Sequence, residues 1–229
     1  MLCRIADLYV EVPGAGGMDA RCRDYLVEGD FTPDIIIKEE EYKPERWPGL
    51  SPEYLEYMDS GWLFYAKLLR EGGLMLHSSA LELDGGAYLF SGPSGVGKST
   101  HTSLWMQEYP NARLFNDDKP ALRRIDGVWY AYGTPWAGKH GININMKVPL
   151  RGICFMRQGE ENSIRRLSSL EATAAIISQT MHRFKTHRAL DKMVEQVDLL
   201  VREIPVYELT NRPEPAAAHL SHDTMSGER

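Results

Sequence analysis

The stretch that decides the fold is Ala87–Thr102, which reads AYLFSGPSGVGKSTHT. Within it, residues 92–99 fit the pattern G-x-x-x-x-G-K-[ST] at every fixed position. The apolar residues Tyr88–Phe90 predict a short buried strand before the glycines, and Leu104 and Trp105 begin a helical pattern after them. A strand, a glycine loop and a helix in this order are the context in which the motif binds phosphates.

Each residue type in this loop has a physical reason. Glycines let backbone N–H groups turn inward as an anion-binding nest, and the positive end of the following helix points to the same place. Lys98 brings a mobile positive charge to the outer phosphates, and Ser99 offers a hydroxyl to Mg²⁺. The predicted nucleotide-binding residues are Gly92, Pro93, Ser94, Gly95, Val96, Gly97, Lys98, Ser99 and Thr100. The alternative is a glycine-rich turn that fits by chance, and the motif does not say what happens to the phosphates.

Length, composition and charge limit the class of protein. A chain of 229 residues with 43% hydrophobic and 25% charged residues is typical of an ordinary soluble globule. The net charge of −6 argues against nucleic acid as a partner, because such binding needs a basic surface. No apolar run has the length of a membrane span, and the N-terminal residues MLCRIADLYVEV lack the pattern of a signal peptide. We therefore expect a cytoplasmic protein with no membrane partner.

The cysteines point to the same compartment. Cys3, Cys22 and Cys154 are scattered and odd in number, so they fit neither a metal pair nor a disulfide framework. We expect buried free thiols in a reducing cytoplasm.

The N-terminal third predicts two strands and a helix. Strands are expected over Ile5–Val12 and Ile35–Lys38. Ser51 followed by proline is typical of a helix start, and apolar residues then recur at near-helical spacing over Tyr54–Arg70. Gly61 weakens the prediction of one unbroken helix there.

The remaining elements alternate between strands and helices. They are a hairpin turning at Asp84–Gly86, a helix over Ser99–Glu108, a strand over Arg113–Phe115, a hairpin of Ala121–Ile125 and Val128–Tyr132, a strand over Arg151–Met156, helices over Leu170–Phe184 and Leu190–Val201, and a strand over Ile204–Leu209. We expect a single domain over residues 1–215, in which residues 1–73 hold the N-terminal strands and helix and 74–215 the nucleotide-binding core. From Arg212 onward we expect a short helical turn and a frayed end, with residues 216–229 as a flexible tail.

A pair of acids gives the second candidate feature. Asp117 and Asp118 follow Lys98 by nineteen and twenty positions, which leaves room for a helix and a return strand. One carboxylate suits Mg²⁺, and the other suits the proton of an attacking hydroxyl. The alternative is a capped turn, since Asn-Asp-Asp is also good turn chemistry. His77 lies on the strand before the loop, where the hairpin either carries it to this site or buries it in the core.

The segment GTPWAGKHG, residues 133–141, is the third candidate. Lys139 and His140 are cations that suit the charge of a transferred phosphoryl group, and Trp136 suits the wall of an acceptor pocket. The alternative is a surface loop with one anchoring tryptophan.

The stretch HSSALELDGGAYLFSGPSGVGKST, followed by NDD, resembles the catalytic domain of bacterial HPr kinase/phosphorylase. That domain belongs to the group that shares the phosphoenolpyruvate-carboxykinase type of phosphate-loop fold, and the likeness covers about Leu74–Pro120. It implies an α/β fold with a mixed sheet, and transfer of the γ-phosphoryl group of ATP to a hydroxyl with Mg²⁺. It also implies catalytic roles for Lys98, for Asp117 as proton acceptor, for Asp118 as the metal-linked acid, and for His77 beside the acidic pair; exchanged roles for the two aspartates stay open.

The chain also departs from that family. The separate N-terminal domain and the segment that grips the protein substrate are not recognisable, so the chain looks like a short stand-alone relative. The expected acceptor is a serine or other hydroxyl on a peptide or small protein, and a homo-oligomer stays open because related kinases assemble. The alternatives are a nucleotide-responsive binding module without transfer activity and a small-molecule kinase. A carboxykinase is disfavoured, because such enzymes are about twice as long.

Overall fold

The computed structural model describes residues 1–14, 17–138, 140–180 and 186–227, and it has a mixed α/β fold with one large curled sheet and one small sheet. The strands are β1 (Leu2–Ile5), β2 (Leu8–Glu11), β3 (Ile35–Ile36), β4 (Gly73–Met75), β5 (Ser78–Leu83), β6 (Gly86–Ser91), β7 (Arg113–Asn116), β8 (Ala121–Ile125), β9 (Val128–Tyr132), β10 (Lys147–Gln158), β11 (Ser163–Arg166) and β12 (Val206–Asn211). The α-helices are α1 (Met18–Cys22), α2 (Pro52–Leu68), α3 (Lys98–Glu108), α4 (Ser169–Gln179), α5 (His187–Glu203) and α6 (Pro215–Ser226).

The large sheet is organised around β10. Its hydrogen-bonded neighbours run in the order β4-β8-β9-β10-β6-β5-β7, and β12 and β11 extend it from β10. The first residues of β10 pair antiparallel with β9, and its later residues pair parallel with β6 and β12. The expected hairpins β5–β6 and β8–β9 are both confirmed. The glycine loop therefore leaves the end of β6, a strand with neighbours on both sides.

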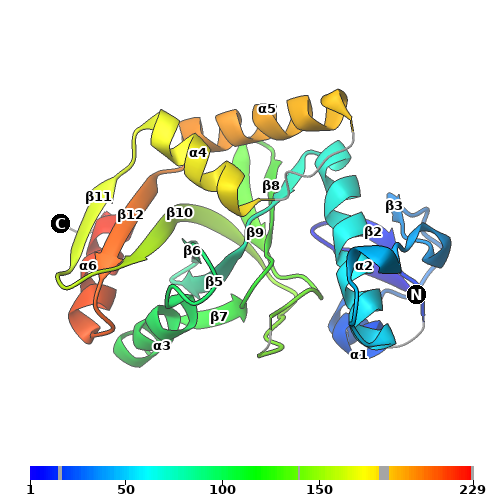
Figure 1. The fold of residues 1–229 in the computed structure, drawn as a ribbon, viewed down its shortest axis with the longest axis horizontal. Coiled ribbons are helices and arrows are strands. Elements are labelled where there is room, and N and C mark those ends of the chain that lie inside the picture. The colour runs from blue at the N-terminus through cyan, green and yellow to red at the C-terminus, as the bar shows by residue number, and fades with distance from the viewer. Residues whose placement is uncertain (15–16, 139, 181–185, 228–229) are drawn as a thin grey trace.

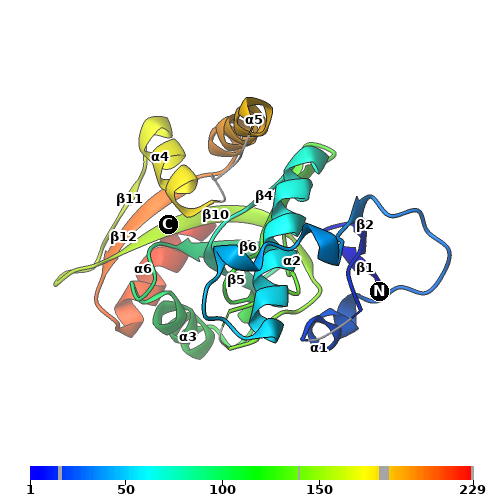
Figure 2. The same ribbon diagram turned by 45° about the vertical axis from the view of Figure 1, so that its right-hand side comes forward.

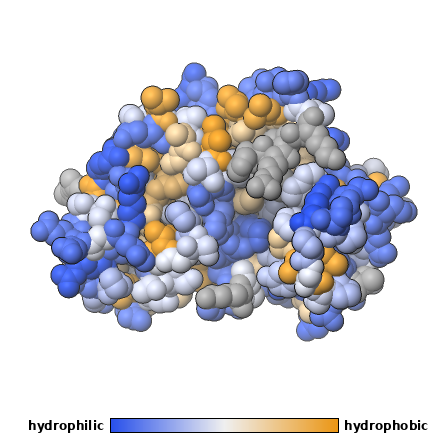
Figure 3. Space-filling model, viewed as in Figure 1, coloured by the Kyte–Doolittle hydropathy of each residue, from blue (hydrophilic) through white to orange (hydrophobic). Residues whose placement is uncertain are grey.

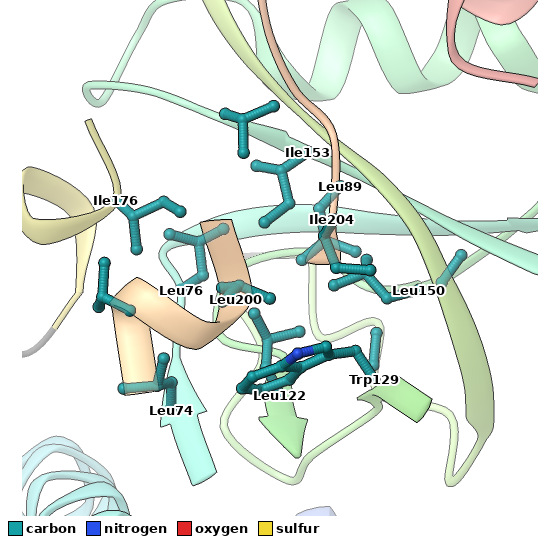
Figure 4. Close-up of a cluster of buried hydrophobic side chains, with 14 of the residues drawn as sticks. Leu74, Leu76, Leu89, Leu122, Trp129, Leu150, Ile153, Ile176, Leu200 and Ile204 are labelled. Carbon is teal, nitrogen blue, oxygen red and sulfur yellow. The ribbon is translucent and has the colours of Figure 1, made fainter. Parts of the chain in front are cut away.

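Helices cover both faces of this sheet (Figures 1 and 2). On the side of α4 and α5, Leu89 and Ile153 of the sheet pack in one cluster with Ile176 and Leu200 of the helices (Figure 4). On the other side, Phe90 packs in a cluster that includes residues of α3 and α6. Successive side chains of a strand point to opposite faces, so a strand covered on both faces is apolar throughout. This is why Tyr88–Phe90 shows no alternation.

The C-terminal segment differs from the flexible tail expected for residues 216–229. Residues Pro215–Ser226 form α6, whose Ala217 and Ala218 are fully buried, and the helix packs against α3. Trp105 Nε1 donates a hydrogen bond of 2.8 Å to Ser221 Oγ across this contact. A proline in the first turn of the helix and small apolar residues behind it supply the start and the buried face.

The N-terminal strand expected over Ile5–Val12 is wrong, because the chain turns back at its beginning. Ala6 and Asp7 have φ angles of 53° and 61°, and they connect β1 and β2 as an antiparallel hairpin. Strand β3 adds to β2 in parallel and completes the small sheet.

Helix α2 runs unbroken through Gly61. Ser51 caps its start, as expected, by accepting the Tyr54 N–H at 3.4 Å. A Cβ built at Gly61 would lie 2.7 Å from Trp136 Cδ1, so the glycine marks a close approach of the loop rather than a break in the helix. In the views of Figures 1 and 2, α2 stands between the small sheet and the large one.

Other differences are smaller. Strand β11 was not expected, and α4 ends at Gln179, before residues 181–185, which lie outside the described part of the chain. The three cysteines are buried and unpaired by disulfide, as expected. Across the described ranges, we find no helix with the length and apolar character needed to span a bilayer. Figure 3 shows hydrophobic surface over α4 and α5. The exposed apolar side chains of these two helices include Leu170, Leu190 and Val194. The homo-oligomer stays a prediction.

Candidate active site

The glycine loop connects β6 to α3. Gly95 and Gly97 have φ angles of 81° and 108°, and a Cβ at either would meet nothing within 4 Å. These positions therefore need glycine for the left-handed backbone and not for space. Helix α3 begins at Lys98, directly after Gly97, and no side chain caps it. Its first N–H groups and the positive end of its dipole are thus left to another partner.

Lys98 lies folded over the loop. Its Nζ donates hydrogen bonds to the backbone oxygens of Gly92 at 2.9 Å and Pro93 at 3.3 Å. Burial lowers the pKa of Lys98, and the negative charge of Asp118 opposes that shift. The fold thus brings the lysine of the first motif within electrostatic reach of the second motif.

One cavity of about 400 Å³ collects most of the expected site residues. They are His77, Ser94, Gly95, Gly97, Lys98, Ser99, Thr100, Asp117, Asp118 and His140. Gly92, Pro93 and Val96 instead line a neighbouring cavity of about 770 Å³ toward β10 and α4, which Ser94 and Gly95 share. Lys139 lies outside the described residues.

The acidic pair sits on a fixed turn after β7. Asn116 is fully buried, and its Oδ1 accepts hydrogen bonds from the N–H groups of Asp118 at 3.1 Å and Lys119 at 2.8 Å. Its Nδ2 donates to Thr134 O at 3.2 Å. The capped turn weighed as an alternative is therefore present, and it is also what aims the two acids.

Asp118 is held between two basic side chains. His77 Nε2 lies 3.1 Å from Asp118 Oδ1, and Lys119 Nζ donates to Asp118 Oδ2. Burial alone would raise the pKa of Asp118, but the hydrogen bond from His77 and the positive charge of Lys119 outweigh it and lower the pKa to about 2. His77 Nδ1 in turn bonds Gln179 Oε1 at 3.1 Å, which ties the pair to the end of α4.

Asp117 has different partners from Asp118. Its Oδ1 accepts the Gly138 N–H at 2.6 Å, and its Oδ2 accepts the His140 N–H at 3.1 Å. A Cβ at Gly138 would lie 3.0 Å from Asp118 Cβ and 3.1 Å from Asp117 Oδ2, so glycine permits this approach. Asp117 therefore fixes the backbone of the third candidate segment against the turn.

Tyr57 and Lys119 are among the residues of the cavity that were not expected from the sequence. Tyr57 OH donates to Ala137 O at 2.6 Å and accepts from Lys119 Nζ at 2.9 Å. Burial would lower the pKa of Lys119, but the charge of Asp118 outweighs it and raises the pKa. The position of Lys119 beside the acidic pair was a usable signal, whereas nothing in the sequence near Tyr57, on a helix sixty residues away, points to the site.

Trp136 is an anchor of the loop. It is fully buried, stacks on Phe64 with ring centroids 4.5 Å apart, and donates from Nε1 to Ser60 Oγ at 3.0 Å. It does not line the cavity of the acidic pair, but it does line an adjoining cavity of about 340 Å³. Among the described residues, no group of three or more His, Cys, Asp or Glu side chains is placed to hold a metal ion.

Comparison with known proteins gives one family. A family model described as "SynChlorMet cassette protein ScmC" matches residues 52–212, well over half of the chain. No curated protein matches. Among solved structures, the Hpr(Ser) kinase/phosphatase from Coxiella burnetii is similar at 12% identity, over 67% of this chain and 97% of that chain, with a TM-score of 0.42. A likeness at this level says nothing about activity.

Proposed function

This chain belongs to the ScmC family, and we propose that it is a kinase that uses Mg-ATP to phosphorylate a hydroxyl on a peptide or small protein. One observation carries the proposal. Lys98 and Ser99, at the start of α3, line the same cavity as Asp117, Asp118 and His77, which come from other parts of the chain. Phosphate-binding and acid–base groups that meet in one cavity are what phosphoryl transfer needs.

The residues present fit a nucleotide and Mg²⁺. The uncapped start of α3 and the left-handed glycines suit phosphate oxygens, and Lys98 suits the outer phosphates. Ser99 and Asp118 offer the oxygen ligands that Mg²⁺ prefers, and Mg²⁺ usually takes only one or two protein ligands beside phosphates and water. When bound, Mg-ATP supplies the phosphoryl group and neutralises its developing charge.

The two aspartates suit different roles. Asp118 has a pKa of about 2, so it is ionised at neutral pH and is a poor proton acceptor, which favours the metal-linked role. Asp117 accepts two backbone N–H groups, while a carboxylate offers about four lone-pair sites. Its remaining lone pairs suit the acceptor hydroxyl. Asp117 would both orient this hydroxyl and accept its proton as the phosphoryl group is transferred.

His77 and Lys119 complete the arrangement by fixing the Asp118 carboxylate from two sides. With His77 tied to α4 and Lys119 tied to Tyr57 of α2, the position of this acid depends on elements on both sides of the cavity.

The test compares two variants with labelled ATP. Lys98→Ala is expected to lose most affinity for Mg-ATP, measured by titration calorimetry. Asp117→Asn is expected to keep that affinity and to lower turnover by about two to four powers of ten. Asp126→Asn, in the turn between β8 and β9, is the matched control and should keep full turnover. Full turnover in Asp117→Asn, or unchanged affinity in Lys98→Ala, would contradict the proposal, and ATP binding without any labelled acceptor would favour the binding module instead.

A further inference from the structure

A second cavity adjoins the one that holds the acidic pair. It has a volume of about 340 Å³, and its walls are mostly aromatic and thioether side chains, including Trp47, Met58, Trp62, Met75 and Trp136. Tyr57, Met58 and Lys119 line both cavities, so the two are neighbours that share one wall. An apolar recess beside a polar reaction site is the usual form of a specificity pocket.

The rim of this recess is already fixed. Asp59 is 1% exposed, and its carboxylate accepts the indole N–H of Trp47 at 3.1 Å and the backbone N–H of Lys43 at 2.8 Å. Arg46 stacks on the ring of Trp62 at 4.0 Å and reaches the same carboxylate. Both tryptophans are therefore held before any ligand arrives, which lowers the entropy cost of binding.

Size and charge indicate what the recess takes. A cavity of roughly 150 Å³ with apolar walls is enough to bind benzene, so this one accommodates a bulky side chain. Aromatic walls also attract cations, but Lys119 lies in the wall itself and Arg46 lies over Trp62. Arg46 already covers the face of Trp62, and Lys119 already lies 5.0 Å from the centre of the Tyr57 ring, so the chain's own cations occupy these aromatic faces and leave less room for a cationic ligand.

We propose that the recess binds a large uncharged apolar side chain of the acceptor, on the residue directly before or after the phosphorylated serine. This inference rests on the proposed kinase function, because the recess selects the acceptor only if the chain phosphorylates one. Because Tyr57, Met58 and Lys119 line both cavities, a single layer of side chains separates them, and a long side chain next to the serine suits such a short separation.

The test uses short capped peptides with one serine. In one set the residue after serine is Trp, Leu, Gly or Lys, and in the other set the same residue precedes it. The measurements are kcat/KM for transfer from labelled ATP and, separately, peptide binding by saturation-transfer NMR. In one of the two sets, the Trp and Leu peptides should exceed the Gly peptide by about 10- to 100-fold in kcat/KM, as expected for burying one large side chain. The Lys peptide should be no better than the Gly peptide.

Variants then locate the preference. Met75→Glu places a charge in the recess, and it should reduce the preference for Trp and Leu to near unity. Met106→Glu is the matched control, since Met106 is 36% exposed on α3 and lines neither cavity, and it should keep the preference. Met75→Trp fills the recess without adding charge and covers the case in which Met75→Glu does not fold.

The outcomes separate the two proposals. A flat peptide preference, or a preference that survives both Met75 variants, would overturn the recess as a specificity pocket. Absence of ATP binding and transfer would instead overturn the kinase function. The NMR measurement, repeated with both Met75 variants and the Met106→Glu control, would still decide whether Trp and Leu peptides bind in the recess. A Lys peptide that binds best would show that the recess is a cation cage and would equally overturn the proposal.

Discussion

Replacing Gly61 with alanine tests the link between α2 and the candidate site. A Cβ at this position would lie 2.7 Å from Cδ1 and 3.1 Å from Nε1 of Trp136, both in the five-membered ring of the indole. The indole has no room to retreat, because it is fully buried, stacked on Phe64 and hydrogen-bonded to Ser60. The substitution is thus expected to displace either the helix or the loop that Trp136 anchors.

The magnitude follows from two opposing effects. Alanine in the middle of a helix is more favourable than glycine by about 1 kcal/mol. Overpacking a rigid core costs about 1–3 kcal/mol, and the fixed partners of Trp136 place this site at the upper end. The net loss in the free energy of unfolding is about 2 kcal/mol, which for a chain of this length lowers the melting temperature by about 4–8 °C.

The assay is urea unfolding of Gly61→Ala, Trp136→Phe and the double variant. Phenylalanine removes Nε1 and with it the hydrogen bond to Ser60 that holds the ring in place, so the smaller ring can move away from the added methyl group. The double variant should therefore be more stable than the sum of the two single losses predicts, with a coupling of about 1 kcal/mol or more. Gly17→Ala is the matched control, since its Cβ would meet nothing closer than 3.8 Å. If Gly61→Ala is as stable as the parent, or if the two substitutions are additive, the reasoning about this contact is wrong.

Two further predictions concern charged groups. Burial lowers the pKa of His101 to about 4, so the unfolded chain takes up a proton before the folded protein does. Acidification from pH 6.5 to 4 should therefore lower the free energy of unfolding by about 3 kcal/mol through this residue. Urea unfolding over the same pH range should show that His101→Gln loses this part of the pH dependence. If the free energy of unfolding of His101→Gln falls with pH as steeply as that of the parent, the reasoning is wrong. Lys119→Met leaves the half-buried Asp118 with His77 as its remaining partner and should cost about 1–2 kcal/mol at pH 7. The matched Lys147→Met breaks a more exposed pair with Asp7 and should cost less than about 1 kcal/mol, so equal losses would show that the Lys119 pair is no more than a surface contact.

Much of the core could be predicted because its signals are local. The glycine loop, the turn at Asp84–Gly86 and the capped start of α2 depend on residues within a few positions of each other. Apolar runs predicted the strands that are buried on both faces. The errors at the N-terminus and the C-terminus are of a different kind, because the turn at Ala6 and Asp7 carries no glycine, and because α6 is stabilised by burial against α3.

The candidate site likewise has one part that could be predicted from local motifs and one part that could not. Lys98 and the acidic pair lie in recognisable motifs, and the fold brings them to one cavity. The partners of each acid depend on contacts that no local pattern encodes. Asp117 meets backbone N–H groups 21 and 23 residues away, and Tyr57 reaches Ala137 across the fold from α2. For Trp136, the sequence left open whether it anchors the loop or forms the wall of a pocket. In the structure it anchors the loop through Ser60, and it also lines the cavity of about 340 Å³.

These contacts also explain why α2 belongs to the site although the phosphate motif does not need it. Tyr57 holds Lys119 with its hydroxyl, and Lys119 holds Asp118, so one chain of hydrogen bonds runs from α2 to the acidic pair. Four residues further along the helix, Gly61 admits Trp136 and thereby places the loop whose N–H groups hold Asp117. Both acids are therefore positioned through one helix, and the recess beside them is lined by the same helix. If the chain is the proposed kinase, a change in α2 should alter acceptor turnover more than it alters ATP affinity, since the glycine loop and Lys98 depend on β6 and α3 instead.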